Sequence, residues 1–220
     1  MKCAHVAACL LCLSVVAIAG QPDTLSAGTT AYEAHDFATA LADFRLAAGR
    51  GDAKAQFALG TMYAHGQGVP QDDAEAAKWI RLSAQRGFAP AQFLFGLINQ
   101  IGDGVRGNSA AGAAWIRLAA QHGYAPAQFQ LGQMHFETGE GVEHSITKEI
   151  KWYRLAAQQG YMPAQLQLGS AYYNGQGVPQ SYIEAGMWWV KTFASVVRVI
   201  FNHVQHETSA WWAAQHKGSN

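Results

Sequence analysis

Apolar residues recur every three or four positions along much of this chain, which is the spacing of one face of an α-helix. In the segment AQFALGTMYAH, Ala55, Leu59 and Met62 or Tyr63 lie at i, i+4 and i+7 or i+8. A second segment, AEAAKWIRLSAQRG, carries the same stripe through Ala76, Trp79 or Ile80, and Ser83. These stripes predict amphipathic helices, and no strand is predicted.

The helical segments return at a nearly constant spacing. The triplet Ala-Gln-Phe that begins at Ala55 recurs at 91 and 127, and as Ala-Gln-Leu at 164, so the steps are 36, 36 and 37 residues. The same spacing separates Trp79, Trp115, Trp152 and Trp188. A fixed period of this length is typical of stacked arrays, in which one unit alone cannot bury its apolar face. Each unit is predicted to be a pair of antiparallel helices.

A GxGV turn occurs once in every unit, beginning at residues 66, 102, 139 and 175. We expect it to join the two helices, because glycine adopts positive φ without strain. Its valine is expected to pack into the core; the four valines are Val69, Val105, Val142 and Val178. The alternative, a phosphate-binding loop, requires a preceding strand and is set aside.

Residues that begin and end helices flank the stripes at fixed positions. Seven residues before each tryptophan stand the predicted N-caps Asp72, Asn108, Ser145 and Ser181. The predicted closing glycines of the second helices are Gly51, Gly87, Gly123 and Gly160. Proline follows at the start of the next helix, at Pro90, Pro126 and Pro163.

The recurring pattern AxxxLGxxY…GxGV…A…W…AAxxG resembles the Sel1-like repeat, a relative of the tetratricopeptide repeat. The resemblance covers residues 51 to about 188 as four copies, with expected bounds 51–86, 87–122, 123–159 and 160–192. It implies an all-α fold, a right-handed α-solenoid of antiparallel helix pairs. In such proteins the concave side, lined largely by the first helix of each pair, holds a partner protein or peptide, and no cofactor is implied.

The two ends of the chain depart from the repeat. Residues 20–50 are interpreted as a linker followed by a degenerate half-repeat. After Trp189 the chain keeps helical spacing without the expected AAxxG, so residues 193–220 are predicted to form a capping helix and tail. Trp211 and Trp212 are expected to fold back on that helix. The alternative is a docking surface for another chain.

Residues 1–19 have the features of a secretory signal peptide: Lys2, an apolar run and the small-x-small site that ends at Ala19. We expect cleavage after Ala19 and a periplasmic or secreted product from a bacterium; a retained anchor is the alternative. The cysteines Cys3, Cys9 and Cys12 all lie in this leader, so the processed chain is predicted to contain no disulfide. Lipidation at Cys9 is set aside, because most of the apolar run follows it.

The charge balance argues against nucleic acid as a partner. Lys plus Arg equals Asp plus Glu at 15 each, which leaves no long-range field to attract a polyanion. We also expect no stable membrane insertion once the leader is removed.

Candidate catalytic and metal sites are weak. Ser145-Ile146-Thr147-Lys148 fits the S-x-x-K pattern of acyl-transferring enzymes, but Ser145 occupies a predicted N-cap and the accompanying S-D-N and K-T-G motifs are absent. The histidines form no repeating column. His203, His206 and Glu207 do not have the spacing of a zinc protease motif. No catalytic residue, metal site or cofactor is therefore predicted.

Two repeating columns have both a structural and a functional interpretation. The tryptophans are predicted to pack in the core, with a stacking platform for sugars as the alternative. An arginine stands two residues after the tryptophan position of the repeat. We interpret this column as a solvated flank with buried stems, or else as a binding stripe. The arginines are Arg45, Arg81, Arg117 and Arg154.

A third column supplies the predicted partner-binding residues. Amides on the first helices offer both donors and acceptors to an extended peptide, and two further polar residues stand in the slot that holds Tyr63 and Tyr172 in other copies. These six residues are Gln56, Gln92, Asn99, Gln128, His135 and Gln165. The competing interpretation, solvated glutamines that a helix tolerates, stays open.

The resulting hypothesis is a non-enzymatic scaffold or adaptor of the bacterial envelope that binds a protein or peptide in a concave groove. Two alternatives belong to other classes. One is a cell-wall hydrolase that uses Ser145 or the terminal histidines, and the other is a carbohydrate-binding module.

Overall fold

The computed structural model describes residues 24–102, 104, 106–136 and 145–194. Over these residues the regular structure is helical, with no strand, which confirms the all-α repeat fold. The predicted leader, with its expected cleavage after Ala19, lies outside the described residues. So do Val105, Val142 and the terminal segment 195–220, which includes His203, His206, Trp211 and Trp212.

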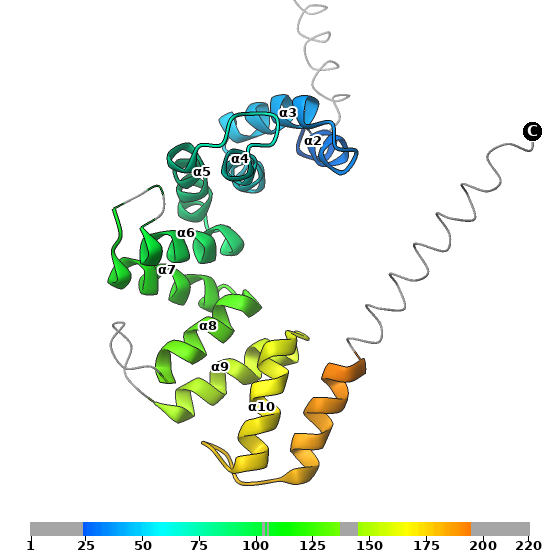
Figure 1. Cartoon of the computed structure of the whole chain (residues 1–220), viewed down its shortest axis with the longest axis vertical. Helices are drawn as coiled ribbons and strands as arrows, with labels where there is room; N and C mark the ends of the chain where they lie inside the picture. The colour runs from blue at the N-terminus through cyan, green and yellow to red at the C-terminus, as the bar shows by residue number, and fades with distance from the viewer. Residues whose placement is uncertain (1–23, 103, 105, 137–144, 195–220) are drawn as a thin grey trace, which may run out of the picture. The chain divides into compact units, whose positions relative to one another are not determined.

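The chain divides into two compact units, Met1–Gly107 and Asn108–Asn220. In each unit, successive helices pack against one another in chain order (Figure 1). The described helices of the first unit are α2 (Thr24–Glu33), α3 (Phe37–Gly49), α4 (Ala53–His65), α5 (Asp73–Gln85) and α6 (Ala89–Ile101). Those of the second unit are α7 (Ser109–Gln121), α8 (Ala125–Phe136), α9 (Ile146–Gln158), α10 (Met162–Asn174) and a further helix whose described part is 182–194.

The GxGV turns that begin at residues 66, 102 and 175 join first and second helices as predicted, and the turn at 139 lies outside the described residues. Gly66 ends α4 in the left-handed conformation, at φ 65°, and Gly102 and Gly175 end α6 and α10 in the same way. The second glycine of the turn allows a close approach as well as a positive φ. At Gly68 (φ 71°) an added Cβ would lie 2.8 Å from the carbonyl oxygen of Phe37, at the start of α3.

The predicted helix boundaries are also confirmed. Each predicted N-cap accepts a hydrogen bond from the backbone N–H three residues on; the four caps are Asp72, Asn108, Ser145 and Ser181. The closing glycines all have φ between 85° and 90°; they are Gly51, Gly87, Gly123 and Gly160. Each repeat therefore begins and ends its helices by local interactions that its own sequence specifies.

The core stripe of the first helices is as predicted, but the tryptophan column is not the core of the second helices. Ala55, Leu59 and Met62 are fully buried. The tryptophans are only half-buried; these are Trp79, Trp115, Trp152 and Trp188. The residue after each holds the core position instead, and Ile80, Ile116 and Tyr153 are buried.

The close approach of two helices explains this correction. Gly60 of α4 faces Ile80 of α5 so closely that an added Cβ would lie 2.7 Å from Ile80 Cγ1. Because the missing glycine side chain makes room for the residue after the tryptophan, the indole of Trp79 packs at the edge of the core beside it. In the last repeat, Trp189 takes the place of Ile80 and lies against Gly169.

The N-terminal segment has more structure than its sequence suggested. In place of a linker and half-repeat, residues 24–49 form a complete helix pair, α2 and α3. A tight turn joins them, with His35 at φ 60°, and Asp36 caps α3 by accepting from the Thr39 N–H at 3.2 Å. Phe44 of α3 is buried against this pair and α4.

Candidate functional site

The predicted partner-binding glutamines are part of the core. Gln56, Gln92, Gln128 and Gln165 are at most 5 % exposed. Each donates from its Nε2 to the carbonyl oxygen eight residues earlier, at the end of the preceding second helix. The four acceptors are Ala48, Ala84, Ala120 and Ala157, at 3.1 to 3.2 Å.

Two of these amides also receive hydrogen bonds on their oxygen. Gln128 Oε1 accepts from Gln159 Nε2 at 2.8 Å, and Gln165 Oε1 accepts from Thr192 Oγ1 at 3.2 Å. The expectation that this column projects toward a partner, or toward solvent, is therefore wrong in its premise. The glutamines bind one repeat to the next, because a helix end leaves carbonyl groups without a partner inside the helix.

Of the two remaining predicted residues, the structure describes the side chain of Asn99 but not that of His135. Asn99 is 9 % exposed, and its Nδ2 donates to Phe95 O of its own helix at 2.8 Å. His135 lies on α8, and its side chain is outside the described residues. A role of these residues in partner binding stays a prediction.

Two arginines of the repeating column each donate a hydrogen bond to a tyrosine hydroxyl of the next first helix. Arg45 Nη2 donates to Tyr63 Oη at 2.9 Å, and Arg154 Nη2 donates to Tyr172 Oη at 3.0 Å. In both pairs the tyrosine lies 18 residues after the arginine, on the next first helix. Arg81 stands at the same offset from Asn99, as Arg117 does from His135, so these two copies have an arginine without its tyrosine.

A hollow of about 380 Å³ lies between α5 and α6, where that tyrosine is missing. Its lining combines apolar walls with polar and cationic groups: Ala74, Ala77, Lys78, Arg81, Phe95 and Asn99. Lys78 is paired with Glu75 at 2.9 Å. Arg81 is exposed and makes no hydrogen bond or ion pair with any residue that the structure describes.

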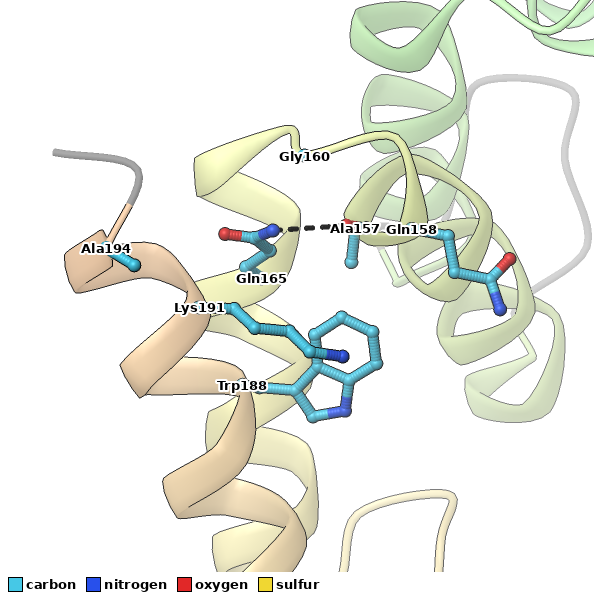
Figure 2. A pocket seen from close by; sticks show the side chains of 7 residues that line it. All are labelled: Ala157, Gln158, Gly160, Gln165, Trp188, Lys191 and Ala194. Atoms are coloured by element: carbon cyan, nitrogen blue, oxygen red, sulfur yellow. Dashed lines mark hydrogen bonds between the residues drawn. The ribbon is translucent and has the colours of Figure 1, made fainter. Parts of the chain in front are cut away.

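A second hollow, of about 350 Å³, lies in the other unit between the end of α9, α10 and the last described helix (Figure 2). The Lys191 side chain lies over the Trp188 ring, with Nζ 4.2 Å from the ring centre, while Gln158 points away. Gln165 forms part of the wall with its hydrogen bond to Ala157. Because its polar groups already bind one another, this hollow offers fewer unsatisfied groups to a ligand than the one beside Arg81.

The remaining chemical candidates have structural roles where they are described. Ser145 is the N-cap of α9 and accepts from the Lys148 N–H at 3.4 Å. His65 Nδ1 lies 2.8 Å from Thr61 O, one turn back in its own helix. Among residues 24–136 and 145–194, where described, no three His, Cys, Asp or Glu side chains gather closely enough to hold a metal ion.

The helices and their repeats define an all-α protein built of stacked helix pairs. The Sel1 repeat matches the chain four times, at residues 53–88, 89–124, 125–161 and 163–192. These matches span more than half of the sequence, and the chain belongs to the Sel1 repeat family.

Solved structures with the same architecture agree. A protective antigen present in uropathogenic Escherichia coli strains, with an SLR fold, gives a TM-score of 0.65 at 35 % identity over 72 % of this chain and 34 % of that one. A Sel1 repeat protein from Oxalobacter formigenes gives 0.64 at 32 % identity, over 70 % of this chain and 63 % of that one. An immunity protein from Pseudomonas aeruginosa gives 0.51 at 20 % identity, over 76 % and 64 %, and shares the fold alone.

The chain spans about a third of the length of the antigen and under two thirds of the Oxalobacter protein. No protein with a curated description matches it. None of the helices that the structure describes has the length and apolar character needed to cross a bilayer.

Proposed function

We propose that this chain is a non-enzymatic scaffold of the bacterial envelope, which holds a protein or peptide against the first helices of its repeats. The observation that carries the proposal is the run of four Sel1 repeats over residues 53–192, a repeat fold common in protein–protein interaction. The buried glutamines support it indirectly. Because they belong to the scaffold, recognition is left to side chains that differ between copies.

Two features support a location in the envelope. Residues 1–19 have the composition of an export signal. The similar Escherichia coli protein is a protective antigen, and an antigen has to be reached by the immune system. Expression with the native leader should therefore give an exported chain that begins at Gly20. Edman sequencing of the purified product checks this, and a product that keeps residues 1–19 would contradict cleavage.

Site-specific photocrosslinking tests where the partner binds. A photoreactive phenylalanine replaces Leu166, which is 50 % exposed on the first helix α10. The matched control replaces Leu155, which is 36 % exposed on the second helix α9. We expect a discrete crosslinked protein in envelope preparations from the Leu166 position only. Crosslinks from Leu155 alone would place the partner on second helices and contradict the proposal.

An activity assay separates the scaffold from the hydrolase. The purified chain is incubated with peptidoglycan and with ester substrates, beside its Ser145→Ala variant. We expect no turnover by either protein. Turnover that disappears in Ser145→Ala would overturn the non-enzymatic assignment.

A further inference from the structure

The hollow between α5 and α6 lies where two side chains are smaller than in two of the equivalent helix pairs; the third pair, α7 and α8, also has an alanine at the first position, Ala113. In α3 and α4 the corresponding positions hold Leu41 and Tyr63, and in α9 and α10 they hold Ile150 and Tyr172. In α5 and α6 they hold Ala77 and Asn99. Phe95 replaces a leucine nearby, yet a space of about 380 Å³ stays open.

The polar groups around this space lack the partners that their equivalents have. Arg45 and Arg154 each donate to a tyrosine hydroxyl, whereas Arg81 has no such acceptor among the described residues. Asn99 uses its Nδ2 to bind Phe95 O, and its amide oxygen has no partner in the described part of the chain. The hollow therefore presents a donor and an acceptor above apolar walls.

A phenol matches this arrangement in both shape and chemistry. Its hydroxyl group accepts one hydrogen bond and donates another, so it can accept from Arg81 and donate to Asn99 Oδ1. Its ring is suited to the walls formed by Ala74, Ala77 and Phe95. The same protein already places a tyrosine hydroxyl on the equivalent arginine twice.

A carboxylate matches less well. It can accept from Arg81, but it cannot donate to the amide oxygen of Asn99. The second cation of the hollow, Lys78, is already paired with Glu75 at 2.9 Å. The carboxylate of Glu75 would repel a carboxylate ligand. A neutral group is therefore favoured over an acidic one.

The size of the hollow is sufficient for one aromatic side chain. Pockets that enclose drug-sized molecules range over roughly 300 to 1,000 Å³, and this one is near the lower limit. Single aromatic side chains seated in pockets often supply much of the binding energy at protein interfaces. We propose that the α5–α6 hollow receives a tyrosine side chain of the partner protein, with its hydroxyl between Arg81 and Asn99. This inference rests on the proposed scaffold function.

The test uses the full chain, purified after expression with its own leader, and N-acetyl-tyrosinamide as the probe. Binding is followed by NMR through the Arg81 Nε–H and Asn99 Nδ2–H₂ signals, with N-acetyl-phenylalaninamide and N-acetyl-glutamate amide as comparison probes. Millimolar binding of the tyrosine probe is expected. The phenylalanine probe, which lacks the hydroxyl, and the glutamate probe should each bind several-fold more weakly.

Two variants test the site from opposite directions. Asn99→Tyr should fill the hollow with the chain's own ring, and Arg81→Gln should remove the donor at an exposed position. Each is expected to weaken the tyrosine probe about tenfold or more, a change of about 1.4 kcal/mol. Arg86→Gln alters an exposed arginine at the end of the same helix, outside the hollow, and should bind the probe as the parent chain does.

Several outcomes would overturn the inference: no binding of the tyrosine probe, equal binding of the phenylalanine probe, tighter binding of the glutamate probe, or full binding by Arg81→Gln. The probe experiment needs no partner, so its failure is distinct from failure of the proposed function. If the probe binds but Leu166 yields no crosslinked protein, the scaffold proposal falls. If crosslinking succeeds and the probe fails, only the tyrosine assignment is lost.

Discussion

Glycine and glutamine at two fixed repeat positions determine how closely neighbouring helices approach. Gly60, Gly132 and Gly169 each face a large side chain of the following second helix, at distances that leave no room for a Cβ. The glutamine four residues before each such glycine ties its helix to the end of the helix that precedes it. These side chains set the helix spacing, so their replacement is expected to lower stability.

Substitution of Gly60 by alanine tests the close approach. The new Cβ would lie 2.7 Å from Ile80 Cγ1 and 3.1 Å from Ala76 O, so the helices must separate, at a cost of about 1–3 kcal/mol in the free energy of unfolding. Urea denaturation measures the change. Gly49→Ala is the control, because its Cβ would meet nothing within 4 Å. Equal effects of the two substitutions would show that α4 and α5 do not approach this closely.

Removal of the Gln165 amide tests the second contact. Gln165→Ala removes the hydrogen bonds to the Ala157 carbonyl and from the Thr192 hydroxyl. Because the carbonyl still accepts from the Gly160 N–H and the hydroxyl still donates to Trp188 O, we expect a cost of about 0.5–1.5 kcal/mol for each hydrogen bond lost. The neighbouring exposed Gln158 supplies the control, for which Gln158→Ala should change stability by less than about 0.5 kcal/mol. Chemical denaturation of both variants measures the difference. A Gln165→Ala variant as stable as its control would mean that the glutamine column is not structural.

At the scale of helices and turns, local hydrogen bonds define where each element begins and ends. Asp36 illustrates this for α3. Hydrogen bonds from Thr39, first from its side chain and then from its backbone, hold the pKa of the Asp36 carboxyl below the usual 3.8. Because the folded pKa is the lower one, the cap stabilises α3 above the unfolded pKa and loses this effect as pH falls through the folded pKa.

This cap gives a prediction for pH. Carbon-detected NMR titration should show Asp36 with a pKa below 3.8. Thr39→Ala should raise that pKa toward the ordinary value, since it removes the largest of the stabilising hydrogen bonds. An Asp36 pKa that does not respond to this substitution would mean that the Thr39 side chain does not bind the carboxylate.

Local rules explain why the element boundaries were predictable and why the site was not. Asp72 and Gly87 act within a few residues of their own positions, so the sequence was sufficient to place them. The stripe of α5 allowed either Trp79 or Ile80 in the core, and the choice depends on Gly60 of another helix. Helix α2, with the sequence TLSAGTTAYE, has no clear apolar stripe and was missed.

The glutamine column shows a second limit of prediction. A glutamine on a helix is usually solvated. Gln92 is instead buried, and the carbonyl oxygen that accepts its hydrogen bond belongs to Ala84 of the preceding helix. The constant offset of eight residues, repeated four times, was the signal in the sequence that could have revealed this contact. For Asn99, the sequence showed that a tyrosine was missing, but only the packing of α5 and α6 showed the hollow that results.

At the scale of the whole molecule, stability arises from contacts between successive helices in each unit. In the second unit, α7 packs on α8, α8 on α9 and α9 on α10. A repeat array of this kind behaves as a one-dimensional chain of interfaces, in which damage at one interface weakens its neighbours first. The loss of local stability should therefore be largest beside a substitution and decrease gradually with distance from it.

Replacement of Ile116 tests this gradient. Ile116 is fully buried in α7, so Ile116→Ala should cost about 2–5 kcal/mol. Hydrogen exchange should accelerate most in α7 and α8 and least in α10. Trp115→Ala is the comparison, and its half-buried ring should cost about 2 kcal/mol, below the value for a fully buried aromatic. Equal acceleration in every helix of the unit would contradict the one-dimensional description.

The hydrogen bond from each glutamine to the carbonyl eight residues earlier makes the repeat interchangeable. Excision of residues 51–86 would join Arg50 to Gly87, and Gln92 would then stand eight positions after Ala48, as Gln56 does now. The new junction would regenerate the contact that it interrupts. Duplication or loss of a whole repeat in the gene can thus change the length of the protein without a mismatched joint, whereas loss of a few residues cannot.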